Sequence, residues 1–416
     1  MKFGGNILKK LLLKKYANAI VTIGANVQKG QHVKINASVE IADFVQLVVE
    51  AAYKAGAKKV YVDWSSEGIT KLNYRYQSVS VMSKVSKWQE EKLAEEVDIV
   101  PCRIVLLSDD PDGFKGVNLE KMQKVQQAHA AVTKKYRDAL DCKQQWTIAA
   151  VPSKAWAKKV FPGMRTHAAV ERLWEAILQT VYVSEDKDPH EEWNRHNKSF
   201  AEKCALLNDY KFDRVQYKSK NGTDFTVWLI PDAKWEGGGE YTLSGQYFNP
   251  NMPTEEIFTS PMKGRAEGTV VATKPLCYRG QLIENFKIVF KDGKAISWSA
   301  EKGEDLLTKM LTFDEGASML GELALIPYDS PINNLGILFY ETLFDENASC
   351  HIAIGSGFTN LIDDYSKYTL EEIHEKGIND SMIHVDFMIG SDDMNITGYT
   401  KNGQGVEIFK NGNWAI

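Results

Sequence analysis

One stretch near the C-terminal end holds most of the side chains whose chemistry suits metal ions. Within residues 320–390 the segments LGELALIP, FDENASCHIAIG and SMIHVDFMIG set carboxylates and imidazoles among Leu, Ile, Val, Phe and Met. An unpaired charge in such apolar surroundings is costly, so these groups need partners that compensate their charge. Bound metal ions are one such partner, and this stretch is the expected chemical centre of the chain.

The segment 382–389 is predicted to be a strand that presents two ligand atoms side by side. The strand period of two places His384 and Asp386 on one face. The other face receives apolar side chains: Ile383, Val385 and Phe387. A solvated strand face is the alternative interpretation, but Met382 and Met388 would share that face with the polar pair, which makes solvation less favourable.

Five other positions are candidates, most of them with a plainer alternative. His351, in the apolar run CHIAIG, is either a core histidine or a ligand. Glu322 stands in another apolar run, and a glutamate is rarely buried without a partner. Glu346 has a turn carboxylate as its alternative, while Glu255 and Glu256 in NMPTEEIFT resemble the capped start of a helix.

The convergence of carboxylates and two imidazoles in one half of the chain favours metal binding over the separate alternatives. Such a carboxylate-rich ligand set suits a pair of divalent ions such as Zn, Co or Mn better than one Zn ion, which usually takes four ligands. Two ions about 3.5 to 4 Å apart can share a bridging water. The pattern therefore indicates hydrolase chemistry.

The elements that must position these groups differ between the two halves. In the first half, a strand at 33–36, a helix at 39–55 ending at Gly56, and a strand at KKVYVDW form a βαβ unit. Further predicted elements are strands at 99–110 and 146–152, a helix at 119–140, and helical segments across 166–209. The first half is therefore expected to be α/β with a parallel-type sheet.

The second half is predicted to be largely antiparallel β. Alternating runs flank Asn221-Gly222 and Asp292-Gly293, which is the strongest local signal for hairpins, and another hairpin closes the chain. We predict an α/β domain at 1–210 with a helical connector at its end, and a β-rich (α+β) metal-binding catalytic domain at 211–416. The boundary is uncertain by several residues.

Composition excludes several functional classes. The 416 residues hold 50 Lys plus Arg against 55 Asp plus Glu, a net charge of -5 without a dense basic run, so no nucleic-acid partner is expected. No phosphate-binding glycine motif follows a predicted strand, which disfavours nucleotide enzymes. No window is apolar enough to span a membrane, and five scattered cysteines indicate reduced thiols. A cytoplasmic protein is expected.

Six segments, in order, resemble a known family. These are GANVQKGQHVKIN, NMPTEEIFTSP, AEGTVVATKPL, LGELALIP, FYETLFDENASCHIAIG and MIHVDFMIG. Together they resemble the metal-dependent aminopeptidases of the aminopeptidase T, aminopeptidase S and PepS group. The resemblance implies a dinuclear centre whose ligands are Glu256, Glu322, Glu346, His351, His384 and Asp386. It also selects Glu256 over Glu255, and Glu256 is our candidate for the base that takes the proton of the attacking water.

The resemblance implies an aminopeptidase that hydrolyses N-terminal residues from short peptides, using two divalent ions and a metal-activated water, and that forms a closed homodimer. The family has a tyrosine where this chain has Phe358. Loss of that hydroxyl removes a possible hydrogen-bond donor worth on the order of 3 kcal/mol. Tyr365 or Tyr368 could supply a replacement. The alternative function is a catalytically weak metal- or peptide-binding homologue on the same scaffold.

Overall fold

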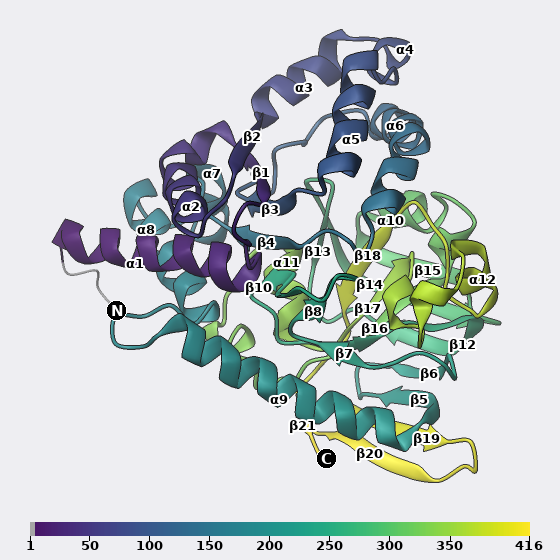
Figure 1. Ribbon diagram of the computed structural model, residues 1–416. Helices are drawn as coiled ribbons and strands as arrows, with labels where there is room; N and C mark the ends of the chain where they lie inside the picture. Colours follow the sequence, from purple (N-terminus) through teal and green to yellow (C-terminus); the bar gives the residue numbers. More distant parts are fainter. Residues whose placement is uncertain (1–4) are drawn as a thin grey trace. The chain divides into compact units, whose positions relative to one another are not determined.

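The computed structural model describes residues 5–416 (Figure 1). By its internal contacts the chain divides into two compact units. Unit 1 runs to Arg195 and includes Gly239–Pro253; unit 2 comprises His196–Gly238 and Thr254–Ile416. The predicted domains 1–210 and 211–416 were defined as parts that fold independently. A division by internal contacts does not test independent folding, so these domains stay a prediction.

Unit 1 is built on a parallel sheet, as predicted. Its strand order is β10-β4-β3-β1-β2, and every pairing along it is parallel. The strands are β1 (His32–Ser38), β2 (Lys59–Ser65), β3 (Cys102–Leu107), β4 (Trp146–Ala150) and β10 (Asn251–Met252). In β1 alternate side chains are buried, which anchors the centre of the sheet in the core of unit 1.

The helices of unit 1 follow the predicted α/β alternation. Their bounds are α1 (Gly5–Ala19), the π-helix η1 (Ile20–Gly24), the 3₁₀ turn η2 (Val39–Ile41), α2 (Ala42–Lys54), α3 (Glu67–Tyr76), α4 (Val79–Met82), α5 (Lys87–Ile99), α6 (Leu119–Leu140), α7 (Lys154–Val160) and α8 (Thr166–Thr180). The prediction of a helix at 119–140 is confirmed. The strand predicted at 99–110 is wrong at its start, because α5 continues to Ile99 and β3 begins only at Cys102.

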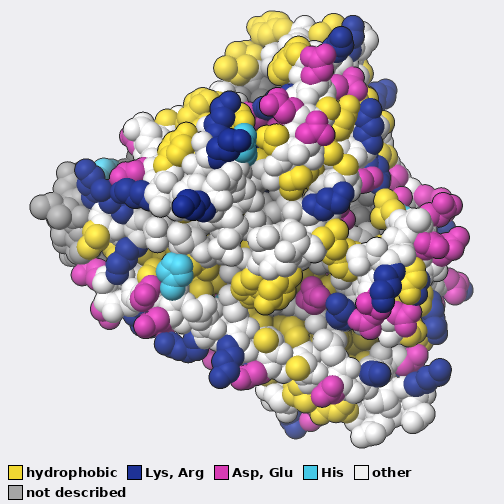
Figure 2. All heavy atoms as spheres, viewed as in Figure 1, with side chains coloured by type: hydrophobic (Ala, Val, Ile, Leu, Met, Phe, Trp, Pro, Cys, Tyr) yellow, Lys and Arg dark blue, Asp and Glu magenta, His cyan; other side chains and the backbone are white. Residues whose placement is uncertain are grey.

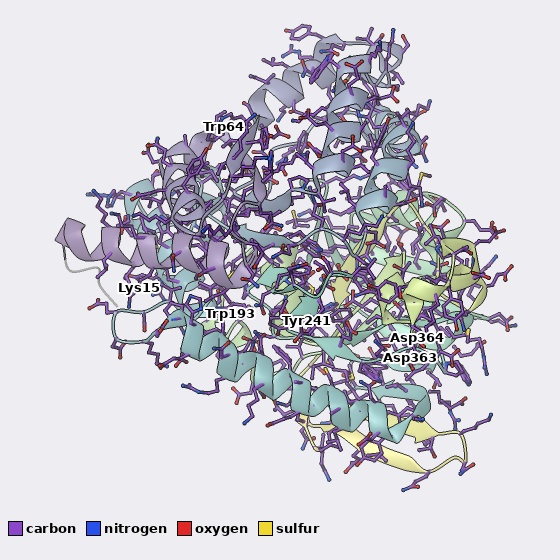
Figure 3. All side chains as sticks on the ribbon, viewed as in Figure 1. Lys15, Trp64, Trp193, Tyr241, Asp363 and Asp364 are labelled. Carbon is purple, nitrogen blue, oxygen red and sulfur yellow. The ribbon has the colours of Figure 1, made fainter. Side chains whose placement is uncertain are left out.

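The helical segment predicted at 166–209 consists of α8, a loop, and α9 (Pro189–Tyr210). The loop is tied down by two side chains of unit 1 that Figure 3 labels. Lys15 Nζ donates to the carbonyls of Ser184 and Glu185, both at 2.9 Å, and the buried indole of Trp193 donates to Val181 O at 3.0 Å. A small hairpin, β8 (Glu240–Tyr241) and β9 (Tyr247–Phe248), completes unit 1.

Unit 2 contains a large antiparallel sheet in the order β13-β14-β12-β6-β5-β19-β20-β21, with β15 paired to β14. Its strands are β5 (Phe212–Lys218), β6 (Asp224–Leu229), β12 (Pro261–Val271), β13 (Leu276–Tyr278), β14 (Gln281–Lys291), β15 (Lys294–Lys302), β19 (Asn395–Thr400), β20 (Gly405–Lys410) and β21 (Asn413–Trp414). The predicted hairpins are confirmed, because β5 pairs with β6 across Asn221-Gly222 and β14 with β15 across Asp292-Gly293. Gly222 and Gly293 both have positive φ, as such turns require.

A second, smaller antiparallel sheet of unit 2 carries the candidate ligands. Its order is β18-β17-β16-β11-β7. The strands are β7 (Glu236–Gly237), β11 (Ile257–Thr259), β16 (Leu320–Leu325), β17 (His351–Gly355) and β18 (His384–Met388). Every residue of β16 and β17 is buried, so both faces of these strands lie inside the fold. The remaining helical elements of unit 2 are α10 (Glu304–Leu311), η3 (Gly316–Ser318), η4 (Asn333–Leu335), α11 (Thr342–Asp345), η5 (Glu346–Ala348), η6 (Thr359–Leu361), η7 (Tyr365–Lys367) and α12 (Leu370–Glu375).

The distribution of charged side chains on the surface agrees with the absence of a dense basic run in the sequence. On the face drawn in Figure 2, basic and acidic side chains are interspersed rather than separated into a track of one sign. Among the helices of the described chain, none is long and apolar enough to cross a membrane. All five cysteines are free thiols, in agreement with the expectation from their spacing.

Candidate metal centre

The register of the smaller sheet brings three candidate ligands onto one face. Glu322 on β16 pairs with Ala353 on β17, which pairs in turn with Asp386 on β18. Directly paired residues of antiparallel strands project to the same side, so the methyl group of Ala353 is the only side chain between the two carboxylates in this row. The neighbouring row places His351 between Ala324 and Met388, on the same face.

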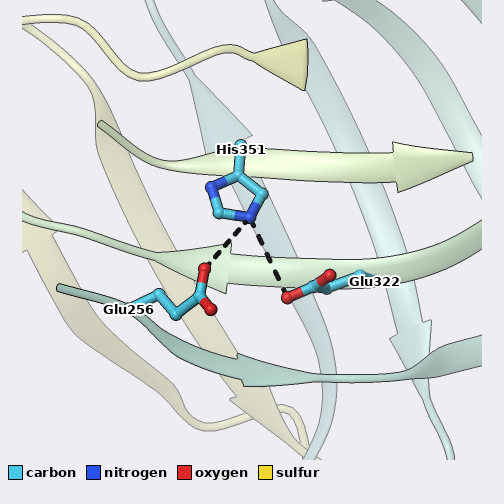
Figure 4. A group of neighbouring side chains, drawn as sticks. All are labelled: Glu256, Glu322 and His351. Atoms are coloured by element: carbon cyan, nitrogen blue, oxygen red, sulfur yellow. Dashed lines mark ion pairs between the residues drawn. The ribbon is translucent and has the colours of Figure 1, made fainter. Parts of the chain in front are cut away.

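His351 is the geometric centre of a first group. Its Nε2 atom lies 3.4 Å from Oε2 of Glu256, 3.9 Å from Oε1 of Glu322 and 3.9 Å from Oδ1 of Asp386. Figure 4 shows the imidazole pointing toward the carboxylates of Glu256, which directly precedes β11, and of Glu322 on β16. All four side chains are buried. The ligand atoms of Glu256, Glu322 and His351 lie close enough together to hold one ion.

His384 forms a second group that shares carboxylates with the first. Its Nε2 lies 3.0 Å from Oε2 of Glu322 and 3.2 Å from Oδ1 of Asp386. Two residues apart on β18, His384 and Asp386 are therefore side by side as the strand period predicted. Glu322 turns one oxygen to each histidine and therefore belongs to both groups of candidate ligand atoms.

Both histidines are held in the tautomer that a metal requires. Nδ1 of His351 donates to the carbonyl of Glu346 at 3.0 Å, and Nδ1 of His384 donates to the carbonyl of Ser356 at 2.7 Å. Because a carbonyl oxygen only accepts, we infer that each Nδ1 carries a proton. Each Nε2 atom then faces the carboxylates, and this is the ring nitrogen that remains available to a metal ion once it has lost its proton.

Glu346 lies in the 3₁₀ turn η5, immediately before β17, and is buried. Its backbone carbonyl orients His351, and its carboxylate oxygen Oε1 is 3.5 Å from Nδ2 of Asn347. Burial raises the pKa of Glu346 well above its usual range, and Asp386, Glu256 and Glu322 raise it further. Its carboxylate thus belongs to the same electrostatic cluster, although it is not a member of either close group of ligand atoms.

The electrostatics of the cluster favour bound cations. Burial raises the pKa of Glu256 well above its usual range, and the charges of Glu322 and Asp386 add to the effect. Burial alone would lower the pKa of His384, but Asp386 and Glu322 outweigh it and raise that pKa. Burial would raise the pKa of Asp386, yet His384 opposes it and the net shift is downward.

Lysine and arginine do not supply the positive charge that these four buried carboxylates need. Within the described part of the chain, none of Glu256, Glu322, Glu346 and Asp386 forms an ion pair with lysine or arginine. Oδ1 of Asp386 is buried and accepts no hydrogen bond from the described residues. Buried oxygens of this kind, with two oriented imidazoles, fit divalent cations.

One interpretation of the sequence needs correction. Glu255 and Glu256 do not cap a helix: they precede the strand β11, and that alternative is wrong. The contacts that hold this segment were not anticipated either. Nε2 of His196 donates to the carbonyl of Thr254 at 2.7 Å, and the Glu255 N–H donates to Oδ1 of Asn347 at 2.7 Å. In the sequence, only the position of Asn347 beside the candidate ligand Glu346 could have indicated its role. Residues that lie so far apart in the chain share no local pattern that would predict their contact.

Phe358 lies at the cluster, as its place in the sequence motif implied. Its ring centroid is 5.0 Å from that of His384 and 5.1 Å from that of Phe258. Tyr365 packs against an apolar cluster of Ile230, Ile362, Ile373 and Ile378. The ring of Tyr368 lies under the ammonium of Lys376 at 4.4 Å. The ring of Tyr365 thus contacts the isoleucine cluster and the ring of Tyr368 contacts Lys376, and neither of these contacts involves a candidate ligand.

Comparisons with known proteins cover nearly the whole chain. Residues 9–414 match the profile of the family described as thermophilic metalloprotease (M29). The chain is 42% identical over 405 residues to aminopeptidase AmpS of Bacillus subtilis (strain 168) and 36% identical over 405 residues to aminopeptidase T of Thermus thermophilus, each match covering 97% of this chain and 98% of the relative. A solved structure, wild-type AmpT from Thermus thermophilus, matches with a TM-score of 0.89 at 36% identity, covering 98% of this chain and all of that one.

Proposed function

The chain belongs to the M29 family of metalloproteases and is a metallo-aminopeptidase, and from that premise we propose that it removes N-terminal residues from short peptides with two divalent ions. The proposed ligands are the six residues predicted from the sequence: Glu256, Glu322, Glu346, His351, His384 and Asp386. The observation that supports this most is the sharing of Glu322 and Asp386 between the Nε2 atoms of two histidines.

Charge balance supports two ions rather than one. Four ionised carboxylates carry four negative charges, and two neutral imidazoles carry none. Two divalent cations would neutralise the set, whereas a single ion would leave two buried negative charges without compensation. The identity of the ions, Zn, Co or Mn, remains open within this proposal, since carboxylate and imidazole ligands suit all three.

The ions would supply Lewis acidity and a lowered pKa for water, as in other two-metal hydrolases. The side chains then have separate tasks. The two Nδ1–H donors keep the imidazoles oriented. Glu256 is the proposed base, because its buried carboxylate lies beside His351 and Glu322 at the candidate metal position. Phe358 excludes water on the His384 side of the cluster.

The proposal is tested by coupling metal analysis to activity. Purified protein with added Co²⁺ or Zn²⁺ is expected to bind two ions per chain and to cleave an aminoacyl-p-nitroanilide and a dipeptide. The same substrates with acetylated N-termini are the matched control and should not be cleaved, because an aminopeptidase acts on a free N-terminus. Binding of two ions without cleavage of any free substrate would instead support the metal- or peptide-binding alternative, which the family membership does not favour.

A homodimer and a cytoplasmic location remain part of the proposal. Neither follows from the fold of one chain, since apolar residues serve cores and interfaces alike. Sedimentation equilibrium of the purified protein tests the first, with a mass of twice 46.8 kDa expected. Fractionation of cells that produce the protein tests the second.

A further inference from the structure

Asn347 connects two candidate ligands that no strand pairing connects. Glu256 precedes β11, so the backbone of residues 254–256 lacks the ladder of hydrogen bonds that fixes the ligands on β16, β17 and β18. Glu346 lies in η5, also outside any strand. Both ligands therefore depend on other contacts for their position.

The side-chain amide of Asn347 provides such contacts to both segments. Its Oδ1 accepts the N–H of Glu255 at 2.7 Å. Its Nδ2 donates to the carbonyl of Leu343 at 2.9 Å and lies 3.5 Å from Oε1 of Glu346. The residue has no solvent exposure. One buried amide thus joins the backbone next to Glu256 to the turn that carries Glu346.

The two backbone partners of Asn347 determine how its amide is oriented and which residue type can satisfy both of them. A backbone N–H only donates and a carbonyl only accepts, so the amide oxygen must face Glu255 and the amide nitrogen must face Leu343. Aspartate would satisfy the first partner and not the second. Alanine would leave a buried N–H and a buried carbonyl unpaired, which costs about 1 to 3 kcal/mol for each group.

Two further contacts show that the segment before β11 is held from several sides. The carbonyl of Thr254 accepts from Nε2 of His196 at 2.7 Å. A Cβ at Gly237 would lie only 2.6 Å from the carbonyl oxygen of Glu256, so the β7 backbone packs directly against this residue. His351 also contacts both ligands, through the carbonyl of Glu346 and the carboxylate of Glu256, whereas Asn347 ties the backbone beside Glu256 to the turn that carries Glu346.

We propose that Asn347 is a positioning residue of the metal centre, whose amide sets the separation of Glu256 and Glu346. The inference rests on the proposed function, since it assumes that both glutamates bind metal. Asn347 itself is not one of the proposed ligands, and its amide is engaged by Glu255, Leu343 and Glu346. Its loss therefore weakens metal binding by displacing ligands, and leaves the recognition of the peptide unchanged.

Calorimetric titration of Co²⁺ into metal-free protein tests this inference, with Asn347→Ala as the main variant. Its metal affinity is expected to fall about 10- to 100-fold, the range typical of losing an outer partner of a ligand. Saturating Co²⁺ is expected to restore kcat, with KM for a dipeptide unchanged throughout. Asn347→Asp, which keeps the acceptor for Glu255, should bind Co²⁺ with an affinity between those of Asn347→Ala and wild type, and it serves as the second variant if Asn347→Ala does not fold.

The matched control is Asn249→Ala, which removes another buried amide, 2% exposed, that donates to the carbonyl of Ile23 in unit 1. It should lower the thermal stability and leave Co²⁺ affinity unchanged. Wild-type affinity in Asn347→Ala, or an equal loss in Asn249→Ala, would overturn the inference. If wild-type protein itself binds no Co²⁺, the proposed function fails instead, so the two failures are distinguishable.

Discussion

At the scale of single residues, Glu322 and Phe358 are the positions whose substitution is expected to affect the proposed site most. Glu322 offers one oxygen to each histidine, 3.9 Å from His351 and 3.0 Å from His384. Phe358 places a ring without a hydroxyl beside His384. Glu322 is expected to determine the metal affinity, and Phe358 is expected to determine the turnover rate of the metal-loaded protein.

Glu322→Gln is expected to lower metal affinity by more than about 100-fold, because losing a ligand should exceed the 10- to 100-fold loss typical of outer partners. Hydrolysis of an aminoacyl-p-nitroanilide should be lost in parallel. Metal content after dialysis and turnover are the measurements. Glu236→Gln is the control, since Glu236 lies on β7 of the same sheet and pairs with Lys234. Retention of both metals and full turnover in Glu322→Gln would show that the ligand assignment is wrong.

Phe358→Tyr is expected to raise kcat by at least about 10-fold, because a hydroxyl beside His384 would add a hydrogen-bond donor to the proposed site, and removal of such donors from active sites costs about 10²- to 10³-fold. The metal affinity should not change. Steady-state kinetics on a dipeptide and metal titration make the comparison. An unchanged kcat would mean that the family hydroxyl is not needed in this chain.

At the scale of elements, the site depends on the close approach of β17 and β18. Gly355 pairs with His384 across these strands and has φ of +102°. A Cβ on Gly355 would lie 2.1 Å from the carbonyl oxygen of Ile383. Only glycine allows this backbone contact, which in turn sets the position of His384 at the start of β18.

Gly355→Ala is therefore expected to lower both stability and metal affinity. Strain at positive φ alone costs about 1 to 3 kcal/mol, and the clash with β18 adds to it. Gly403→Ala separates the two effects, because Gly403 has φ of +82° and open space around its missing Cβ. Thermal unfolding and Co²⁺ titration should show that both variants lose stability and that only Gly355→Ala binds metal more weakly. Equal metal affinity in the two variants would contradict this account of β18.

At the scale of the whole molecule, the metal centre makes stability depend on pH and on metal. Glu256, Glu346 and His384 have pKa values raised in the folded, metal-free protein, as described above. Burial also raises the pKa of Asp345 to about 7, against the opposing effect of hydrogen bonds such as that from the Phe339 N–H. In each case the folded state binds a proton more tightly than the unfolded chain does.

The metal-free protein is therefore expected to be less stable at about pH 8 than at about pH 6, because stability from raised pKa values is lost as the pH rises through them. Asp386 has a lowered pKa, so its contribution is lost only in the acid range. Excess Co²⁺ should reverse the trend, since ligands must lose their protons to bind metal, and each site filled at 100 times its Kd adds about 2.7 kcal/mol. Thermal unfolding at both pH values, with and without Co²⁺, tests this. A rise in the metal-free melting temperature between pH 6 and pH 8 would refute it.

Sequence patterns determined much of this protein because they arise from local rules. The helix at 119–140, the βαβ unit and the hairpins at Asn221-Gly222 and Asp292-Gly293 follow from periodicity and turn chemistry, and the structure confirms them. The adjacency of His384 and Asp386 follows from the strand period alone. The resemblance of six segments identified the family, which the comparisons confirm.

Only the tertiary structure decided how the candidate residues meet. The row of Glu322, Ala353 and Asp386 depends on strand register, and the contact of Asn347 with Glu255 joins positions 92 residues apart. The helix cap that was the alternative interpretation of Glu255 and Glu256 is wrong, because a carboxylate pair after a threonine suits a helix start or the approach to a strand equally well. Local sequence fixes which face of an element a side chain occupies, whereas its partners across the fold are set by the packing of the whole unit.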